Sequence, residues 1–271
     1  MLLFTRMSRM CWSRPARALV LSMVAALLMA PASHADTVMI TGANSGLGLE
    51  LARQYAKEGW TVIAVHRRDS TPQTLADLGK QYAKVRVERM DVADEAQVRA
   101  LASKMKDVPI DVLINNAANT DTGETQRFGK LDYALGREVL ATNILGALLV
   151  TESFLPQIEA GGQKKVVSIT STHASVSQPL AGSGAIFYRA SKAGLNRAML
   201  AVSEDLRPKG IAVALVNPGS MRMSIDEPAT NAYGDRVMVD IVAGTMIKTI
   251  GRISMAESGR FMHYDGTMLA W

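Results

Sequence analysis

Cysteine is nearly absent from this chain of 271 residues, in which Cys11 is the only one. A single cysteine forms no intramolecular disulfide. Its position ahead of the first apolar run also excludes the lipid-carrying cysteine of a lipoprotein, which would follow that run. The four histidines lack the spacing of metal ligands, so we expect no metal site. Basic segments interleaved with aromatic residues are missing too, which argues against a nucleic-acid partner.

Acidic residues are missing from the first 35 positions, which have the features of a secretory signal peptide. Four arginines precede an apolar run, 18–30, which ends at Pro31, and small residues at 33 and 35 offer a cleavage site. The run has 13 residues, whereas crossing a bilayer takes about 20. We therefore expect residues 1–35 to be a signal peptide and the protein to be exported to the periplasm. The alternative is a membrane-anchored or cytoplasmic protein whose leader is not functional.

The predicted leader also accounts for the excess of positive charge. The chain has 30 lysines and arginines against 25 acids, and removing the four arginines of the leader leaves 26 against 25. The remaining 236 residues (271 minus 35) belong to a chain that is 48% hydrophobic, enough for one sizeable core. No repeat, low-complexity stretch or Pro/Gly-rich linker divides them. We expect residues 36–271 to form one domain.

Apolar, β-branched segments alternate with segments of helical periodicity along this domain. Predicted strands lie at 38–41, 61–65, 84–90, 111–114, 165–169 and 211–216, and predicted helices at 46–58, 76–82, 94–105, 131–155 and 186–206. Strands that are apolar throughout and separated by helices predict a parallel sheet. We therefore expect an α/β fold of the Rossmann type, a doubly wound parallel sheet with helices on both faces. Its ligands would bind at the carboxyl ends of the strands.

A glycine-rich segment, TGANSGLG at 41–48, joins the first predicted strand to the first predicted helix. Its glycines, Gly42, Gly46 and Gly48, permit a tight turn, a close approach of the backbone to a pyrophosphate, and close packing of helix on strand. The amino end of the helix adds N–H donors and a positive dipole for phosphates. The placement directly after the first strand of an α/β chain predicts a dinucleotide-binding loop.

The end of the second predicted strand indicates which dinucleotide binds. NAD enzymes usually place a carboxylate there for the ribose 2′-hydroxyl, but this chain has His66-Arg67-Arg68, and the first acid is Asp69. An arginine can pair with a 2′-phosphate through charge-assisted hydrogen bonds. Arg67 therefore favours NADP over NAD, unless the two arginines are solvated loop charges.

Tyr188 and Lys192 are four residues apart on the predicted helix 186–206, so they share a face of it. A phenol ionises near pH ~10, and a neighbouring ammonium lowers its pKa. Such a tyrosine can pass a proton to or from a carbonyl or alcohol oxygen near neutral pH. Taken alone, the spacing is also that of a surface lysine one turn after a half-buried tyrosine.

Together these motifs resemble the short-chain dehydrogenase/reductase superfamily over nearly the whole chain from Val38 onward. The ordered set is TGANSGLG at 41–48, Asp91-Val92, Asn115-Asn116-Ala117, Asn143, Ser171, Tyr188-x-x-x-Lys192 and Asn217-Pro218-Gly219. The segments YRASKAGLN (188–196) and GRFMHYDGTMLAW (259–271) are similar to the C-factor/sniffer-like carbonyl reductase branch. Two positions depart from the family pattern: Ala118 replaces the glycine of Asn-Asn-Ala-Gly, and Met223 replaces a threonine that usually contacts the nicotinamide.

The resemblance implies a role for each matching residue. Tyr188 would be the acid in reduction and the base in oxidation, and Lys192 would hold the nicotinamide ribose and lower the pKa of Tyr188. Ser171 would bind the substrate oxygen, and Asn143 would help to hold a water that relays protons to Lys192. The predicted cofactor-binding set is Thr41, Gly42, Asn44, Ser45, Gly46, Leu47, Gly48, Arg67, Asp91, Val92, Asn115, Ala117, Tyr188, Lys192, Pro218 and Gly219.

We therefore expect an NADP-dependent oxidoreductase that transfers hydride between nicotinamide and a carbonyl or alcohol substrate, in particular a small-to-medium apolar ketone or aldehyde. The alternative is a cofactor-binding signalling or sensing protein without significant turnover, which the altered residues after Gly219 favour. The resemblance also implies a homo-oligomer, a dimer or a tetramer. A Gly-Ser-Gly segment at 182–184, just before Tyr188, is expected to form a substrate-side loop.

Overall fold

The computed structural model describes residues 35–178, 182–231 and 234–271. Apart from its last residue, the predicted signal peptide lies outside the described residues. The Gly-Ser-Gly segment at 182–184, predicted to form a substrate-side loop, lies within the described residues.

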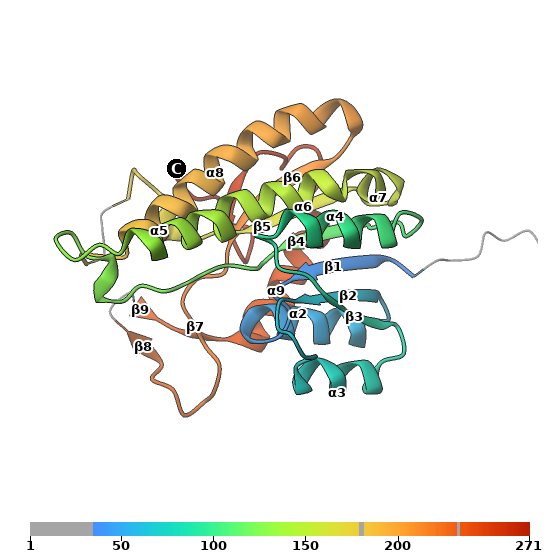
Figure 1. The fold of residues 1–271 in the computed structure, drawn as a ribbon, viewed down its shortest axis with the longest axis horizontal. Coiled ribbons are helices and arrows are strands. Elements are labelled where there is room, and N and C mark those ends of the chain that lie inside the picture. The colour runs from blue at the N-terminus through green and yellow to red at the C-terminus, as the bar shows by residue number, and fades with distance from the viewer. Residues whose placement is uncertain (1–34, 179–181, 232–233) are drawn as a thin grey trace, which may run out of the picture. The chain divides into compact units, whose positions relative to one another are not determined.

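A seven-stranded sheet forms the centre of the domain, in the order β11-β6-β5-β4-β1-β2-β3 (Figure 1). The strands are β1 (Thr37–Thr41), β2 (Thr61–His66), β3 (Val85–Arg89), β4 (Val112–Asn115), β5 (Lys165–Ile169), β6 (Ala212–Asn217) and β11 (Phe261–His263). All neighbouring pairs are parallel; in register, Val38 of β1 lies between Val62 of β2 and Val112 of β4. The predicted Rossmann-type fold is confirmed. The strand order reverses direction between β1 and β4, where such folds bind their ligands.

Helices cover both faces of this sheet (Figure 1). One face packs against α2 (Gly46–Lys57), α3 (Gln73–Gln81) and α9 (Val239–Arg252), and the other against α4 (Glu95–Lys104), α6 (Ala147–Ser153) and α8 (Ile186–Leu206). Side chains of β1 alternate between the two cores: Ile40 joins the first and Met39 the second, and both are fully buried. Burial on both faces explains why the strands are apolar without a polar alternation.

The helical stretch predicted at 131–155 is a continuous helix that is π-helical in its middle. It consists of α5 (Tyr133–Leu140), a π-helical turn (Ala141–Gly146) and α6, followed by α7 (Leu155–Ala160). A π-turn widens the helix by one residue and is frequent at functional sites. Here it contains the predicted residue Asn143.

The C-terminal part of the fold was not predicted from periodicity. After β6, short strands β7 (Met221–Arg222), β8 (Thr230–Asn231), β9 (Gly234–Asp235) and β10 (Val237–Met238) lead into α9 and then β11. β7 pairs with β10 and β8 pairs with β9, so this segment forms two small sheets beside the carboxyl ends of the main strands. Strands of two or three residues are too short to show a period of two.

Candidate active site

The glycine loop between β1 and α2 is fastened to the end of β4. Asn116 donates from Nδ2 to the carbonyl oxygens of Thr41 (2.9 Å) and Gly42 (3.1 Å). In return, Thr41 Oγ1 accepts the backbone N–H groups of Asn116 and Ala117, each at 3.0 Å. This contact requires Gly48, since a Cβ there would lie 2.4 Å from Gly42 O and 2.5 Å from Asn116 Nδ2. The loop therefore has a fixed shape that depends on its glycines.

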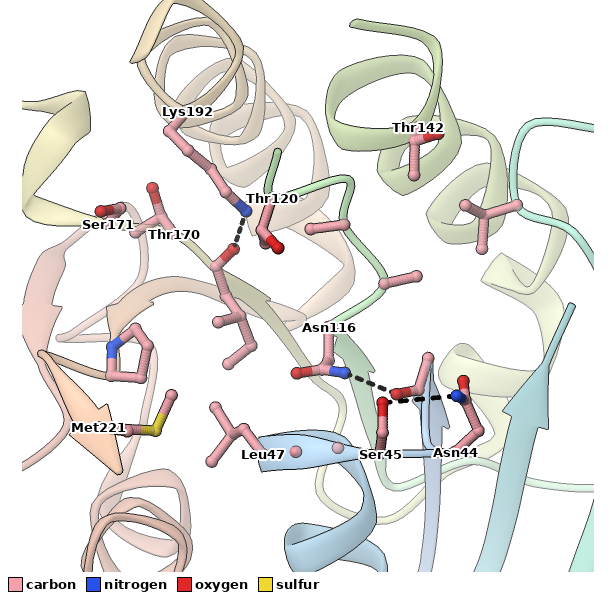
Figure 2. Close-up of a pocket in the computed structure, with 18 of the residues that line it drawn as sticks. Asn44, Ser45, Leu47, Asn116, Thr120, Thr142, Thr170, Ser171, Lys192 and Met221 are labelled. Carbon is pink, nitrogen blue, oxygen red and sulfur yellow. Dashed lines mark hydrogen bonds between the residues drawn. The ribbon is translucent and has the colours of Figure 1, made fainter. Parts of the chain in front are cut away.

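A cleft of about 570 Å³ runs from this loop along the carboxyl ends of the strands to α8. The predicted residues that line it are Gly42, Asn44, Ser45, Gly46, Leu47, Gly48, Arg67, Asp91, Val92, Ala117, Ser171, Tyr188, Lys192, Pro218 and Gly219. Figure 2 shows its two ends, with Ser45 and Asn44 at the glycine loop and Ser171 and Lys192 at the other. The fold thus brings residues predicted from seven separate segments into one cavity.

Three predicted residues lie behind the wall of this cleft. Thr41 braces the loop as described above. Asn115 is 5% exposed, and its Nδ2 donates to Thr151 Oγ1 (2.9 Å) within the second core layer. The neighbouring Asn116 lines the cleft instead, because side chains alternate in direction along an extended segment. The side chain of Asn115, predicted to bind the cofactor, therefore lies in the core and not in the cleft.

Asn143 is the third of these residues, and its side chain is fully engaged. Its Oδ1 accepts from Asn119 N (2.7 Å), and its Nδ2 donates to Asn119 O (3.0 Å) and Ser191 Oγ (2.9 Å). Ser191 Oγ in turn donates to Tyr188 O (2.7 Å). The amide of Asn143 therefore positions α8 and the segment after β4, whereas the neighbouring Thr142 lines the cleft.

Tyr188 lies in the first turn of α8, half-buried at the cleft. Its backbone N–H donates to Gln126 Oε1 (2.9 Å), a side chain that is fully buried. Burial raises the pKa of the Tyr188 phenol, and its hydrogen bond with Ser171 lowers the pKa in part. Ser171 Oγ already accepts from His173 N (3.2 Å), so the hydroxyl proton of Ser171 is directed to another acceptor. Tyr188 and Ser171 therefore place a protonated phenol beside a hydroxyl that can donate a hydrogen bond.

Lys192 is buried one turn further along α8, and its Nζ donates to Ile169 O at 2.8 Å (Figure 2). Its Nζ lies 5.9 Å from the centre of the Tyr188 ring. Burial lowers the pKa of Lys192 to about 8. Desolvation dominates the pKa of the Tyr188 phenol, while the ammonium of Lys192 donates to the end of β5; a lowering of the Tyr188 pKa by Lys192 stays a prediction.

We expect Lys192→Met to be more stable at pH 7 than the parent protein, by about 1 kcal/mol after the lost hydrogen bond to Ile169 is subtracted. The pKa of Lys192 falls from 10.5 unfolded to about 8 folded, so the unfolded chain holds the extra proton between these values and the parent gains stability as pH rises. The parent should gain about 2 kcal/mol relative to the variant from pH 7 to 9.5, so that the parent becomes the more stable of the two. Urea unfolding at both pH values measures it, and a pH-independent difference would contradict it.

A second cleft of about 730 Å³ meets the first at the acid–base residues. The two cavities share Thr120, Ser171, Tyr188, Asn217, Gly219 and Met221. The remaining lining of the second is Thr122, Thr172, His173, Ser175, Gln178, Arg189, Ser220 and Asn231. Among the described residues of this lining, hydroxyls and amides dominate, and Met221 is the one aliphatic side chain. The predicted small-to-medium apolar ketone or aldehyde stays a prediction.

Several lining residues are outside the predicted cofactor-binding set, although Asn116, Ala118, Asn217 and Met223 belong to segments that resemble the family. Arg68, Met90, Asn116, Ala118, Thr120, Thr142, Ile169, Thr170, Asn217, Met221 and Met223 also line the first cleft. Most directly follow a strand or neighbour a predicted residue, so position at a strand end was the available signal. Thr120 lies in a loop and Thr142 in the π-turn, and there neither periodicity nor a motif indicates that the side chain faces the cleft.

The first cleft fits a nicotinamide dinucleotide. At one end the backbone of the glycine loop is open to a ligand, since a Cβ at Gly46 would meet nothing within 4 Å. Arg67 and Arg68 follow β2 and are exposed beside it, where a ribose phosphate would need cations. At the other end Asn217 Nδ2 is buried and donates to no described residue, so a ligand amide or hydroxyl could accept from it. One cavity thus contains an accessible glycine backbone, two arginines and a buried amide donor along its length.

The chain belongs to the short-chain dehydrogenase/reductase family, whose model, described as short chain dehydrogenase, matches residues 36–234. A relative, the C-signal of Myxococcus xanthus, is 36% identical over 174 residues, 64% of this chain and 100% of that protein. The structure of NADPH-bound carbonyl reductase from chicken fatty liver has a TM-score of 0.79 at 26% identity, covering 88% of this chain and 100% of that one. The structure of the carbonyl reductase Sniffer of D. melanogaster has a TM-score of 0.77 at 25% identity, covering 88% of this chain and 100% of that one. The protein is therefore an oxidoreductase of the carbonyl reductase-like branch that uses a nicotinamide cofactor.

Proposed function

We propose that this protein is an NADP-dependent carbonyl reductase whose cofactor occupies the first cleft and whose substrate occupies the second. The observation that carries this proposal is the meeting of the two cavities at Ser171 and Tyr188. A reductase needs its hydride donor and its carbonyl to meet at a proton donor, and these residues provide one where the two cavities join.

A nicotinamide dinucleotide, when bound, supplies the hydride for the carbonyl carbon. Tyr188, kept protonated by burial, donates its phenolic proton to the carbonyl oxygen, so that the carbonyl becomes an alcohol. The Ser171 hydroxyl donates a hydrogen bond to the same oxygen and stabilises the charge that develops on it. Lys192 is within reach of both the end of β5 and the first cleft, and its ammonium stabilises the phenolate left after transfer.

The preference for NADP is attributed to Arg67 and Arg68. Both are exposed at the end of β2 and line the cleft, and Asp69, the first acid after them, is paired with Arg89 at 2.7 Å. A carboxylate held in an ion pair competes poorly for a ribose hydroxyl, whereas two guanidinium groups suit a 2′-phosphate.

We expect the double variant Arg67→Ala, Arg68→Ala to lose about 10- to 100-fold in NADPH affinity and little in NADH affinity, since charge-assisted hydrogen bonds contribute about 1.5–3 kcal/mol. Fluorescence titration of both cofactors measures the ratio of the two dissociation constants. Arg99→Ala, which removes an exposed arginine outside this cleft, is the control. An unchanged ratio in the double variant would show that the arginines are solvated loop charges.

The first experiment on the function itself is titration of purified protein with NADPH and NADH, followed by a panel of carbonyl compounds. Binding of NADPH with turnover of any carbonyl supports the reductase. Binding without turnover favours a cofactor-binding signalling protein, for which the name of the C-signal relative is the specific support. In that case Met223, which lines the first cleft 47% exposed, is the residue to replace by Thr.

We further propose that residues 1–35 direct export and are removed, so that the mature protein begins near Asp36. N-terminal sequencing tests this, and a cytosolic protein that retains these residues contradicts it.

A homo-oligomer is proposed as well, supported by the apolar surface that Leu140 and Leu145 expose beside the π-turn (37% and 62% exposed). Light scattering of the purified protein gives the number of copies.

A further inference from the structure

The helix that carries Tyr188 and Lys192 begins without a capping side chain of its own. Ala185 directly precedes α8, and the side chain of an alanine accepts no hydrogen bond. The first bond inside the helix runs from Arg189 N to Ala185 O (2.8 Å), so the backbone N–H of Tyr188 has no acceptor within α8. A Ser, Thr, Asp or Asn in the place of Ala185 commonly accepts from a donor at this position.

Gln126 supplies the missing acceptor from a distant part of the chain. Its Oε1 accepts from Tyr188 N at 2.9 Å, across 62 positions of sequence. Gln126 ends a 3₁₀ turn (Glu124–Gln126) between β4 and α5, and its side chain is fully buried. Its Nε2 donates to Asp121 O, within the same segment. Both polar ends of this amide are therefore engaged, and one of them caps α8.

The backbone at the start of α8 has a conformation that its own sequence does not favour. Ala185 has φ 53° and ψ 34°, in the left-handed region that residues with a Cβ rarely adopt, and it is 5% exposed. Such a conformation persists where the surrounding structure determines it. Next to Ala185 along the helix, the ring of Phe187 packs on α5, since a Cβ at Gly136 would lie 2.8 Å from it (Figure 1). Tertiary contacts therefore fix where α8 begins.

The segment that carries Gln126 also forms part of both clefts. Thr120 lines the two cavities, and Thr122 lines the second. Asn119, at the beginning of the segment, is held through its backbone N and O by the side chain of Asn143. The segment is thus fixed by Asn143 at one point and joined to Tyr188 by Gln126 at another. A displacement of this segment would therefore move the first turn of α8.

We propose that Gln126 is a positioning residue for Tyr188, whose amide holds the first turn of α8 where the two clefts meet. This inference rests on the proposed reductase function, because it concerns the acid of the same reaction. Among the described residues Gln126 lines neither cleft, so it acts through Tyr188 and not by contact with cofactor or substrate. An apolar side chain at this position would leave Tyr188 N and Asp121 O without their partner.

Gln126→Met tests the proposal, because methionine is similarly long and flexible but lacks the amide. With NADPH and a carbonyl compound that the parent reduces, we expect kcat to fall at least about tenfold, since a misplacement of about 1 Å can cost about 100-fold. NADPH affinity should stay within about twofold, because the cofactor contacts do not involve Gln126. Exchange of the Tyr188 amide hydrogen, followed by mass spectrometry on peptides from the start of α8, should become at least about tenfold faster.

A double-mutant cycle with Tyr188→Phe separates positioning from general damage to the fold. Once the phenolic oxygen is gone, its position no longer affects the rate. Gln126→Met should therefore lower the residual kcat of Tyr188→Phe by less than about twofold. The same tenfold loss in both backgrounds would overturn the proposal, because a residue that only stabilises the fold acts on both alike.

Gln157→Met is the matched control, since it removes another buried amide that lines neither cleft. Gln157 lies in α7, is 3% exposed, and donates from Nε2 to Ala102 O (2.8 Å). The variant should lose stability but keep the kcat and the Tyr188 amide exchange of the parent protein. Unfolding midpoints of all variants, measured in urea, show that each is folded.

Gln126→Glu is the conservative variant and carries the test if Gln126→Met does not fold. Its carboxylate keeps an oxygen for Tyr188 N, and a negative charge is favourable at the amino end of a helix. We expect its kcat within about threefold of the parent value and a Tyr188 amide that exchanges at the parent rate. A folded Gln126→Glu with a tenfold loss of kcat would overturn the proposal.

Amide exchange also distinguishes a failure of this proposal from a failure of the reductase. If the parent protein reduces a carbonyl and Gln126→Met keeps the parent kcat, the positioning role is overturned and the reductase stands. If the parent reduces no carbonyl, the reductase proposal fails, and the hold of Gln126 on Tyr188 is judged by exchange alone. Faster exchange in Gln126→Met but not in Gln157→Met then supports it, and equal exchange overturns it.

Discussion

Replacing Tyr188 by Phe is expected to lower kcat for carbonyl reduction by about 10²- to 10⁴-fold, the usual contribution of a positioned general acid. The variant removes only the phenolic oxygen, and Ser171 then donates to the substrate oxygen without a proton source beside it. The helix is expected to keep its place, because the backbone bonds of Tyr188 with Gln126 and Ser191 do not involve the hydroxyl. NADPH affinity should therefore remain within about twofold. Steady-state kinetics and a cofactor titration on the same preparation measure both quantities.

Tyr133→Phe is the control for this experiment, because it removes a hydroxyl from a tyrosine of α5 that is 66% exposed and lines neither cleft. It should turn over like the parent protein. Turnover by Tyr188→Phe at the parent rate would show that Tyr188 is not the acid. Loss of NADPH binding by this variant would show instead that the phenol serves the cofactor site.

The second large effect is expected at Gly48, where an alanine should abolish measurable NADPH binding, a loss of at least about 100-fold. The added Cβ would meet the backbone atom Gly42 O at 2.4 Å and Asn116 Nδ2 at 2.5 Å, and this side-chain nitrogen is held by its hydrogen bonds to Thr41 O and Gly42 O. The loop must therefore separate from the segment after β4. Overpacking of this kind costs about 1–3 kcal/mol, so the variant should also be less stable. Cofactor titration and urea unfolding report the two effects separately.

Gly79→Ala is the matched control for this prediction. Gly79 lies within α3, and an added Cβ would make only ordinary contacts, the nearest to Val87 at 3.9 Å. Alanine is preferred to glycine inside a helix, so this variant should gain about 0.5–1 kcal/mol and bind NADPH normally. Normal NADPH binding by Gly48→Ala would contradict the close loop contact described here.

Much of the fold follows from local sequence signals. The strand at 165–169 and the helix at 186–206 begin and end where they were predicted, because apolar β-branched runs and helical spacing are strong in both segments. The glycine loop was equally clear, since each of its glycines has a conformational or steric reason in the structure. By contrast α9 and β11 were missed, and a strand of three residues has too few positions to show a pattern.

The candidate site could be predicted as a set of residues but not as a geometry. The motif containing Asn115 and Asn116 was found from the sequence, yet only the sheet pleat determines that Asn116 faces the cleft and Asn115 the core. The i, i+4 spacing places Lys192 on the same helix face as Tyr188. The direction of its ammonium is decided by the carbonyl of Ile169, which belongs to β5 and is far away in the sequence.

The fold class, the dinucleotide loop and the Tyr188–Lys192 pair could be predicted from the sequence alone, because each depends on residues that are close together in the chain. The direction of the pKa shift of Tyr188 and the lining of the second cleft depend on the three-dimensional packing. Desolvation of the phenol depends on everything packed around it. The lining of the second cleft comes from segments after β4, β5 and β6 and from the start of α8, which meet only because the parallel strands end at one edge of the sheet.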